Sequence, residues 1–369
     1  FYRTERLEAQ TGNDSMKFNY NGISQFSSIR NTASSSTLDR LGFKSEGTNL
    51  NLRYQNNTII ADSLFGIKYN LSNFDLNKYG FNHVTSEKTI GLYQNNNASQ
   101  LAILTDGIYK NIDFTVNTLD NQTSLLNALS GLNLNYFKRA PSQLFDKDAK
   151  SLNQRVAKNV SNSNQDFVTI TYRVIAPPHS QLYVSVPNIS WSDDNNHSLS
   201  ITVNGVTRNQ VTDNTFDFFD LGYFETESMV TIKLSFPGNK AISFDNPSFY
   251  ALDTQNYQIA MDTINERDSK VTTSNNKVFV DYSSKTNASL FFTIPYDKGW
   301  TATINHKKVK IHRAQKGFMK VDVPSGKGKV VLTFIPYGLK TGLLISLLAS
   351  IIFCCYAYFI RKITVIQKR

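Results

Sequence analysis

The feature that most constrains this chain is a run of twenty uncharged, mostly apolar residues near its C-terminus, residues 341–360 (TGLLISLLASIIFCCYAYFI). At about 1.5 Å rise per residue, a helix of this length spans roughly 30 Å, the thickness of a bilayer's hydrocarbon core. Tyr337 before the run and Tyr356 and Tyr358 near its end suit the membrane interfaces. The run predicts a membrane-spanning helix over residues 339–360, with a buried core helix as the weaker alternative.

The residues that follow the run are strongly basic. They carry four positive charges: Arg361, Lys362, Lys368 and Arg369. Short basic segments beside a membrane helix stay in the cytoplasm. We therefore expect residues 361–369 to be a cytoplasmic tail, and everything before Lys340 to lie outside the cytoplasm. Because the chain begins at Phe1 without a signal peptide, we expect it to be part of a larger protein.

Composition supports folded domains in the 369-residue chain. Hydrophobic residues make up 40% and aromatic residues 12%, enough apolar mass to exclude wholesale disorder. The two cysteines, Cys354 and Cys355, are adjacent and lie inside the apolar run. They exclude a disulfide scaffold and a Cys-based zinc site, and nothing in the sequence indicates another metal site or a cofactor.

The chain divides into modules by its hydrophobic periodicity. Residues 1–135 mix short helix and strand patterns and predict an α/β module, with helices over 36–43 and 121–133. The second helix is expected to be capped near Thr123 and ended by Gly131. Residues 136–165 are assigned to a linker or edge segment. Strand patterns and the Asn204-Gly205 hairpin signal then predict a β-sandwich over 166–252. A helical bridge (253–269) and a small basic β-sandwich (270–336) follow, so the predicted fold is mainly β.

Positive charge is concentrated in the module next to the membrane. Residues 296–330 hold nine Lys and Arg and only two Asp and Glu, whereas the net charge of the whole chain is +10. This pattern favours contact with anionic lipid or an anionic envelope polymer rather than nucleic acid. Edge-strand lysines that prevent aggregation are an equally good explanation. The residues assigned to a polyanion or membrane surface are Lys307, Lys308, Lys310, Arg313 and Lys316.

No P-loop, GxSxG elbow, HExxH motif or EF-hand loop is present, so no catalytic residue is assigned. The segment YNGISQFSS (residues 20–28) alternates amides and hydroxyls with aromatic rings, a mixture that suits sugars or lipid headgroups. A glycine-containing turn that packs Phe26 inward is the plainer explanation.

Several segments together resemble the C-terminal extracytoplasmic part of the bacterial YfhO family of membrane proteins. The matching text is RTERLE with Asn13-Asp14, YNGISQFSS, ADSLFGIKYNLS (61–72), GLYQNNNA (91–98), NQTSLLNALSG, IPYDKGWTATINHKKVKI (294–311) and PSGKGKVVLTFIPYGLKTGLLIS. The middle sandwich carries little of the resemblance.

The resemblance implies a polytopic protein similar to GT-C glycosyltransferases, which moves a sugar from a polyprenyl-phosphate donor to teichoic acid in Gram-positive bacteria. GT-C enzymes place an acidic catalytic residue in their first outer loop, so this chain is expected to lack it. Its partners would be the membrane portion of the same protein, the bilayer and the anionic polymer. Arg6, Asp14, Asn21, Gln25 and Ser27 are the expected substrate-facing residues.

Two other functions stay open at this point. A non-catalytic, membrane-tethered module that binds carbohydrate or envelope polymers would have the same sandwiches and anchor. A sensor that signals through its helix is disfavoured, because a tail of residues 361–369 holds no output domain.

Overall fold

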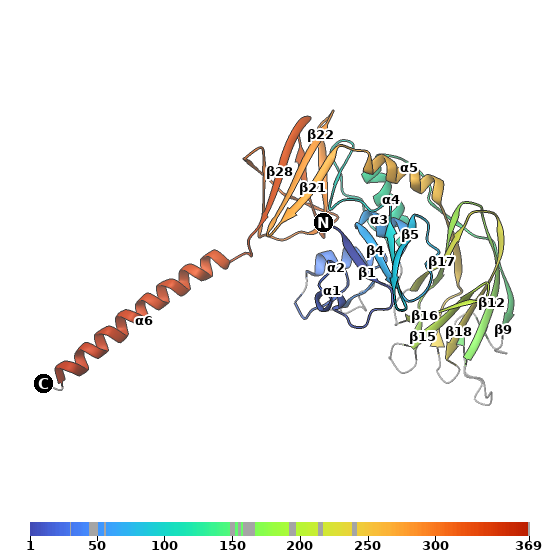
Figure 1. Cartoon of the computed structure of the whole chain (residues 1–369), viewed down its shortest axis with the longest axis horizontal. Helices are drawn as coiled ribbons and strands as arrows, with labels where there is room; N and C mark the ends of the chain where they lie inside the picture. The colour runs from blue at the N-terminus through green and yellow to red at the C-terminus, as the bar shows by residue number, and fades with distance from the viewer. Residues whose placement is uncertain are drawn as a thin grey trace.

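The apolar run forms a long helix that projects away from the folded body (Figure 1). The computed structural model describes residues 1–29, 31–43, 51–54, 57–147, 152–153, 156–157, 167–191, 197–212, 217–237 and 242–367. Helix α6 (Leu339–Gln367) contains a stretch, Leu339–Arg361, with a mean hydropathy of 2.4 and no burial within the structure. Its length and composition suit a membrane span, as the sequence predicted. Lys368 and Arg369 of the basic tail lie outside the described residues.

The first module is α/β, as predicted. Its sheet has the order β1-β4-β6-β5, with β1 parallel to β4 and the other pairs antiparallel. The strands are β1 (Arg3–Arg6), β4 (Ile67–Ser72), β5 (Phe81–Glu87) and β6 (Ile90–Asn95), and a two-stranded sheet joins β2 (Gln25–Phe26) to β3 (Asn51–Leu52). The helices are α1 (Asp14–Lys17), α2 (Thr32–Asp39), α3 (Ile59–Leu64) and α4 (Thr118–Ser130).

Both predicted helices begin earlier than the sequence indicated, because asparagines cap them. The Asn31 side chain accepts a hydrogen bond from the Ser34 amide at the start of α2. The Asn117 side chain accepts hydrogen bonds from two backbone amides at the start of α4. The observed cap is therefore Asn117 and not the expected Thr123. Asparagine is as good an N-cap as serine or aspartate. The predicted end of α4 is confirmed, since Gly131 adopts a left-handed conformation with φ of 79°.

The middle module is a sandwich of two antiparallel sheets with the orders β16-β15-β18-β12-β9 and β17-β13-β20-β8. Its long strands are β12 (Phe167–Ala176), β13 (Ser180–Val186), β15 (His197–Val203), β16 (Val206–Thr212), β17 (Asp217–Phe224), β18 (Ser228–Pro237) and β20 (Ser248–Asp253). The predicted hairpin turn is confirmed: Asn204 and Gly205 have φ of 46° and 91° between β15 and β16.

Part of the segment assigned to a linker or edge contributes edge strands to this sandwich. β8 (Phe137–Arg139) pairs with β20, and β9 (Ser142–Lys147) pairs with β12. A small sheet with the order β10-β11-β19-β14 adds four two-residue strands: β10 (Leu152–Asn153), β11 (Val156–Ala157), β19 (Ile242–Ser243) and β14 (Ser190–Trp191). Most of residues 148–165 lie outside the described residues.

The third module is a second sandwich, with sheet orders β21-β22-β28-β24-β25 and β26-β27-β23-β7. Its strands are β21 (Ser269–Ser274), β22 (Lys277–Ser284), β23 (Ala288–Pro295), β24 (Trp300–Ile304), β25 (Lys307–Val309), β26 (His312–Ala314), β27 (Phe318–Val323) and β28 (Gly326–Phe334). The remaining strand, β7 (Ala102–Leu104), comes from the first module and pairs with β23.

Shared cores fuse the modules into one body. Helix α5 (Thr254–Asn265), the predicted bridge, packs against α4 and buries Tyr257 and Met261 in the core of the first module. The same core takes in side chains from the other two modules: Tyr183 and Phe218 of the middle sandwich, and Phe291 and Phe318 of the third. The first module is therefore held between two sandwiches, with α6 leaving from the third (Figure 1).

Candidate functional site

Asp14, expected to face substrate, is buried and bonded within its own loop. Its side chain is buried, and its carboxylate accepts hydrogen bonds from the Gln10 amide (2.8 Å) and from the Thr11 amide and hydroxyl (2.7 and 2.8 Å). Burial alone would raise the pKa of Asp14, but these bonds and the charge of Arg6 hold that pKa below its usual value. The carboxylate therefore closes the loop before α1 and stays ionised.

The other four expected substrate-facing residues belong to different local structures. Ser27 exchanges hydrogen bonds with the backbone of Ile29, and Gln25 lies exposed in β2. Asn21 is exposed, and its amide donates to the Tyr2 carbonyl over 3.4 Å. Arg6 is half-buried, close enough to Asp14 to lower its pKa. Among the described residues, no hydrogen bond links one of the five to another.

Asn21 nonetheless lies near the start of the membrane helix. It lines a pocket of about 530 Å³ together with Phe1, Trp300 and Phe334. The Trp300 and Phe334 rings lie 5.0 Å apart, and Phe334 ends the strand that leads into α6. The N-terminal segment and the base of α6 are therefore neighbours.

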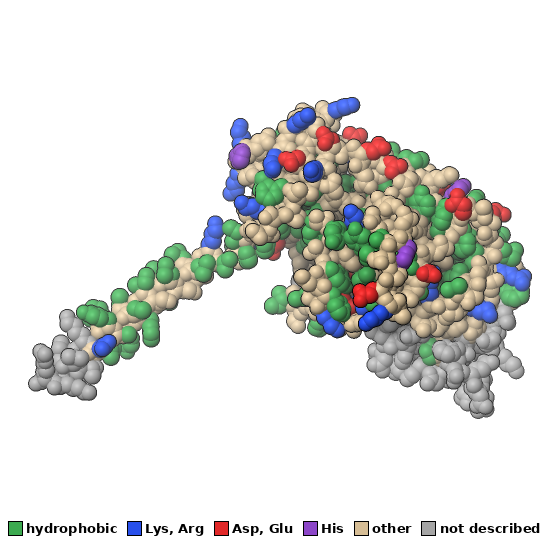
Figure 2. Space-filling model, viewed as in Figure 1, with side chains coloured by type: hydrophobic (Ala, Val, Ile, Leu, Met, Phe, Trp, Pro, Cys, Tyr) green, Lys and Arg blue, Asp and Glu red, His purple; other side chains and the backbone are tan. Residues whose placement is uncertain are grey.

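Four of the five expected polyanion-binding residues do come together. β25 and β26 are edge strands of the two facing sheets, and the chain crosses from one to the other through residues 310 and 311. Lys307, Lys308, Lys310 and Arg313 are exposed along this edge, and the Arg313 guanidinium stacks 4.5 Å from the ring centre of Tyr296. Figure 2 shows Lys and Arg side chains along the edge of this sandwich on the side of α6.

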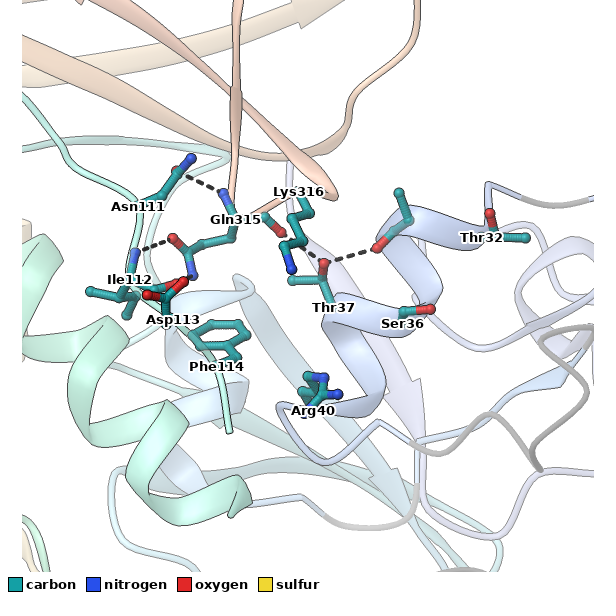
Figure 3. A pocket seen from close by; sticks show the side chains of 11 residues that line it. Thr32, Ser36, Thr37, Arg40, Asn111, Ile112, Asp113, Phe114, Gln315 and Lys316 are labelled. Carbon is teal, nitrogen blue, oxygen red and sulfur yellow. Dashed lines mark hydrogen bonds between the residues drawn. The ribbon is translucent and has the colours of Figure 1, made fainter. Parts of the chain in front are cut away.

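The fifth, Lys316, lies in a pocket that the sequence did not indicate (Figure 3). This interdomain pocket has a volume of about 540 Å³ and lies between α2, the segment before α4 and the turn from β26 to β27. It is lined by Thr32, Ala33, Ser36, Thr37, Arg40, Asn111, Ile112, Asp113, Phe114, Gln315 and Lys316.

Gln315 holds the three walls of the interdomain pocket together. Its side-chain oxygen accepts from the Ile112 amide (2.8 Å) and the Tyr109 hydroxyl (2.9 Å), and its side-chain nitrogen donates to the Ile112 carbonyl (2.9 Å). The Thr37 hydroxyl of α2 donates to the Gln315 carbonyl over 2.8 Å (Figure 3). Burial raises the pKa of Tyr109, so its hydroxyl remains a donor at physiological pH.

The turn that carries Gln315 requires unusual backbone geometry. Gln315 and Lys316 both have positive φ, 47° and 60°. The next residue, Gly317, lies so close to α2 that a Cβ there would be 2.6 Å from the Ser34 Cα. Because glycine has no Cβ, this turn of the third sandwich can pack directly against a helix of the first module.

The lining of the interdomain pocket combines positive charge with hydroxyl groups. Lys316 is exposed, and the described residues supply no acidic partner for its ammonium group. The Arg40 guanidinium donates to the Thr115 carbonyl over 2.6 Å, which leaves further donors available. Thr32 and Ser36 add exposed hydroxyls, and Asp113 is the one acidic residue in the lining. This chemistry suits binding of an anionic polyol better than acid–base catalysis by paired carboxylates.

No sequence signal pointed to this pocket, because its residues come from three separate stretches of chain. Arg40 follows a short helix that carries no motif, and Gln315 is a single amide in a chain that has many side-chain amides. In the part of the chain that the structure describes, no group of three His, Cys, Asp or Glu side chains could hold a metal ion.

Solved structures show only distant likeness to this chain. A Paenibacillus sp. cycloisomaltooligosaccharide glucanotransferase matches with 9% identity and a TM-score of 0.21, covering 57% of this chain and 50% of its own. The CBM22-1–CBM22-2 tandem of Paenibacillus barcinonensis Xyn10C matches with 11% identity and a TM-score of 0.21, covering 55% and 91%. Scores this low support no argument about fold or ligand.

The sequence comparisons are more informative. YfhO of Bacillus subtilis (strain 168), described as an uncharacterized protein, is 22% identical to this chain over an alignment of 386 positions. The alignment covers 96% of this chain. The match covers 43% of that relative, so this chain spans less than half of its length. The family model for bacterial membrane protein YfhO matches residues 1–346, which comprise the whole body and the start of α6. This chain therefore belongs to the YfhO family of bacterial membrane proteins.

Proposed function

We propose that this chain is the extracytoplasmic C-terminal part of a polytopic membrane glycosyltransferase. The whole protein would move a sugar from a polyprenyl-phosphate donor to a cell-envelope polymer such as lipoteichoic acid. The catalytic acidic residue would lie in the membrane portion that precedes this part. This part would bind the acceptor polymer, with the basic residues at the C-terminal end of the chain, 361–369, in the cytoplasm.

The observation that carries the proposal is the interdomain pocket. A glycerol- or ribitol-phosphate polymer presents phosphates and hydroxyls in alternation. Arg40 and Lys316 supply cationic donors for phosphate, while Thr32 and Ser36 supply partners for hydroxyl groups. Phe114 adds an apolar surface for C–H groups. The lining therefore offers partners for both the phosphates and the hydroxyl groups of such a polymer.

The basic edge of β25 and β26 would extend this binding surface by weak, long-range attraction. Its exposed side chains interact through water, so their effect should fall steeply with ionic strength. Replacing Lys307, Lys308 and Lys310 with Gln should weaken binding of the chain to purified lipoteichoic acid at low salt. Lys233, which is exposed on β18 of the middle sandwich, provides a control substitution. Unchanged binding by the triple variant would remove this edge from the proposal.

The test of the function is the sugar content of lipoteichoic and wall teichoic acid from cells that lack the full-length gene. Complementation with the intact gene should restore a missing sugar. The Arg40→Ala/Lys316→Ala variant should restore less of that sugar at equal protein level, whereas Lys233→Ala should restore all of it. Unchanged glycosylation in the deletion strain would refute the proposed activity. Polymer binding by the chain, if retained in that case, would favour a membrane-tethered binding module instead.

A further inference from the structure

Four large apolar side chains are exposed within a short stretch of the first module. Met16 and Phe18 belong to α1 and its end, and their exposed fractions are 79% and 46%. Phe26 of β2 is 50% exposed, and Ile29 is 91% exposed. We call these four residues the apolar rim. Four such residues within fourteen positions are more than the single exposed apolar side chains that are normal on a soluble surface.

Hydrogen bonds hold the backbone that presents the apolar rim. The Asn13 side chain accepts from the Phe26 amide (2.8 Å) and donates to the Phe26 carbonyl (3.1 Å). The Ser27 hydroxyl closes a turn onto Ile29, and the buried Asp14 carboxylate closes the loop before α1. Polar side chains therefore stabilise turns whose apolar side chains point to the outside, an arrangement with no benefit in water.

The apolar rim lies on the side of the body from which the membrane helix leaves. Figure 1 shows α1 and α2 on the side of the body that faces α6. The Asn31 side chain, two residues after Ile29, donates to the Tyr296 carbonyl over 2.8 Å. Tyr296 comes just before β24, whose first residue, Trp300, contacts Phe334 at the base of α6. A short path of contacts thus joins the rim to the start of the membrane helix.

Basic side chains accompany aromatic rings at both places. The Lys17 ammonium lies 5.0 Å from the ring centre of Phe18 in the rim. At the base of α6, the Lys298 ammonium lies 5.7 Å from the ring centre of Tyr337. Lysine and aromatic side chains together are typical of membrane interfaces, where the ring enters the acyl boundary and the amine stays among the headgroups. The rim is thus chemically similar to the surroundings of α6.

We propose that the apolar rim is a second membrane contact, inserted into the leaflet that the body faces, beside α6. This goes beyond the proposed function and does not depend on it. A single helix, joined to the body through a short segment that contains Pro336 and Gly338, leaves the body free to tilt. Two separated contacts fix its orientation, and with it the height of the interdomain pocket above the bilayer.

The test uses the 369-residue chain in nanodiscs that contain phosphatidylglycerol and phosphatidylcholine. Cys354 and Cys355 are first replaced by Ser, which leaves no other thiol. Single cysteines labelled with an environment-sensitive NBD dye are then introduced at Met16 or Ile29. Control cysteines replace Val206 or Met229, which are 61% and 68% exposed on the middle sandwich, far from α6 (Figure 1).

The proposal predicts a blue shift of the dye emission, and quenching by lipids brominated near the top of the acyl chain, at Met16 and Ile29 only. Water-like emission at these two positions, or the same shift at Val206 and Met229, would overturn it. Because the dye is itself apolar, a second variant tests the protein's own side chains. Ile29→Asp should reverse most of the shift of a dye at Met16, whereas Met229→Asp should not. A blue shift of the dye at Met16 that is unchanged by Ile29→Asp would also overturn the proposal.

Discussion

The interdomain pocket depends on one buried amide, which makes Gln315→Ala the sharpest test of how it is built. The substitution removes three hydrogen bonds, to the Tyr109 hydroxyl and to the amide and carbonyl of Ile112. Tyr109 is only 4% exposed, so water cannot replace its lost partner. Ile112 is half-buried, so its backbone groups recover part of their hydration.

The magnitude follows from these three contacts. A typical hydrogen bond contributes about 1 kcal/mol, and a buried group left without a partner costs about 1–3 kcal/mol. Full loss at Tyr109 and partial loss at Ile112 together predict a destabilisation of about 2–4 kcal/mol. The backbone is already in the left-handed region at this position, and alanine is no better suited to it than glutamine.

The assay is urea unfolding of the detergent-solubilised chain, followed by tryptophan fluorescence. Gln315→Ala should lower the midpoint without changing the slope. Lys316→Ala is a matched control, because Lys316 has the same positive φ but an exposed side chain, and its cost should stay within about 0.5 kcal/mol. Equal midpoints for the two variants would refute the role of Gln315. If the reasoning is correct, Gln315→Ala in the full-length protein should also lower glycosylation more than stability alone explains.

Three further predictions concern the interior. Lys78 and Asp62 form a fully buried ion pair, so Lys78→Met should lower the unfolding free energy by about 3–5 kcal/mol by leaving a buried carboxylate unpaired. Adding Asp62→Leu should recover much of this free energy in a double-mutant cycle. Additive costs of the two substitutions would contradict the pairing. Burial raises the pKa of Asp220 from 3.8 to about 6, so its stabilising contribution is full below pH 3.8 and is lost as the pH rises through 6. Relative to Asp220→Asn, the unfolding free energy should therefore fall by up to about 3 kcal/mol between pH 4 and 8, and parallel pH profiles would contradict this. Gly317→Ala should force the turn away from Ser34 at a cost of about 1–3 kcal/mol, and an unchanged unfolding midpoint would show that the contact gives way.

The elements with strong local signals were predicted well. The apolar run, the Asn204-Gly205 hairpin and the alternating strands of both sandwiches appear where their periodicity placed them. Each of these depends on neighbours in sequence: twenty uncharged residues, two residues able to take positive φ, or a period of two. The helix starts were placed too late, because asparagine caps do not stand out in a chain so rich in asparagine.

Pairings between distant segments could not be predicted. β7 has three residues and looks like part of the first module, yet it completes a sheet of the third by pairing with β23. A short buried strand carries no information about its partner, because its hydrogen bonds are made by backbone groups that every residue has. The same holds for β8 and β9, which add to the two sheets of the middle sandwich.

The sequence by itself determined the membrane helix, the mainly β architecture, the basic character of the last module and the resemblance to the family. These depend on composition, local periodicity and ordered motifs, which need no knowledge of the packed chain. Only the tertiary structure decided that Asp14 is a buried loop closure, that Lys316 separates from the other basic residues, and that Arg40 and Gln315 meet it across two modules. Such groupings are set by which surfaces pack together, since packing brings together side chains hundreds of residues apart.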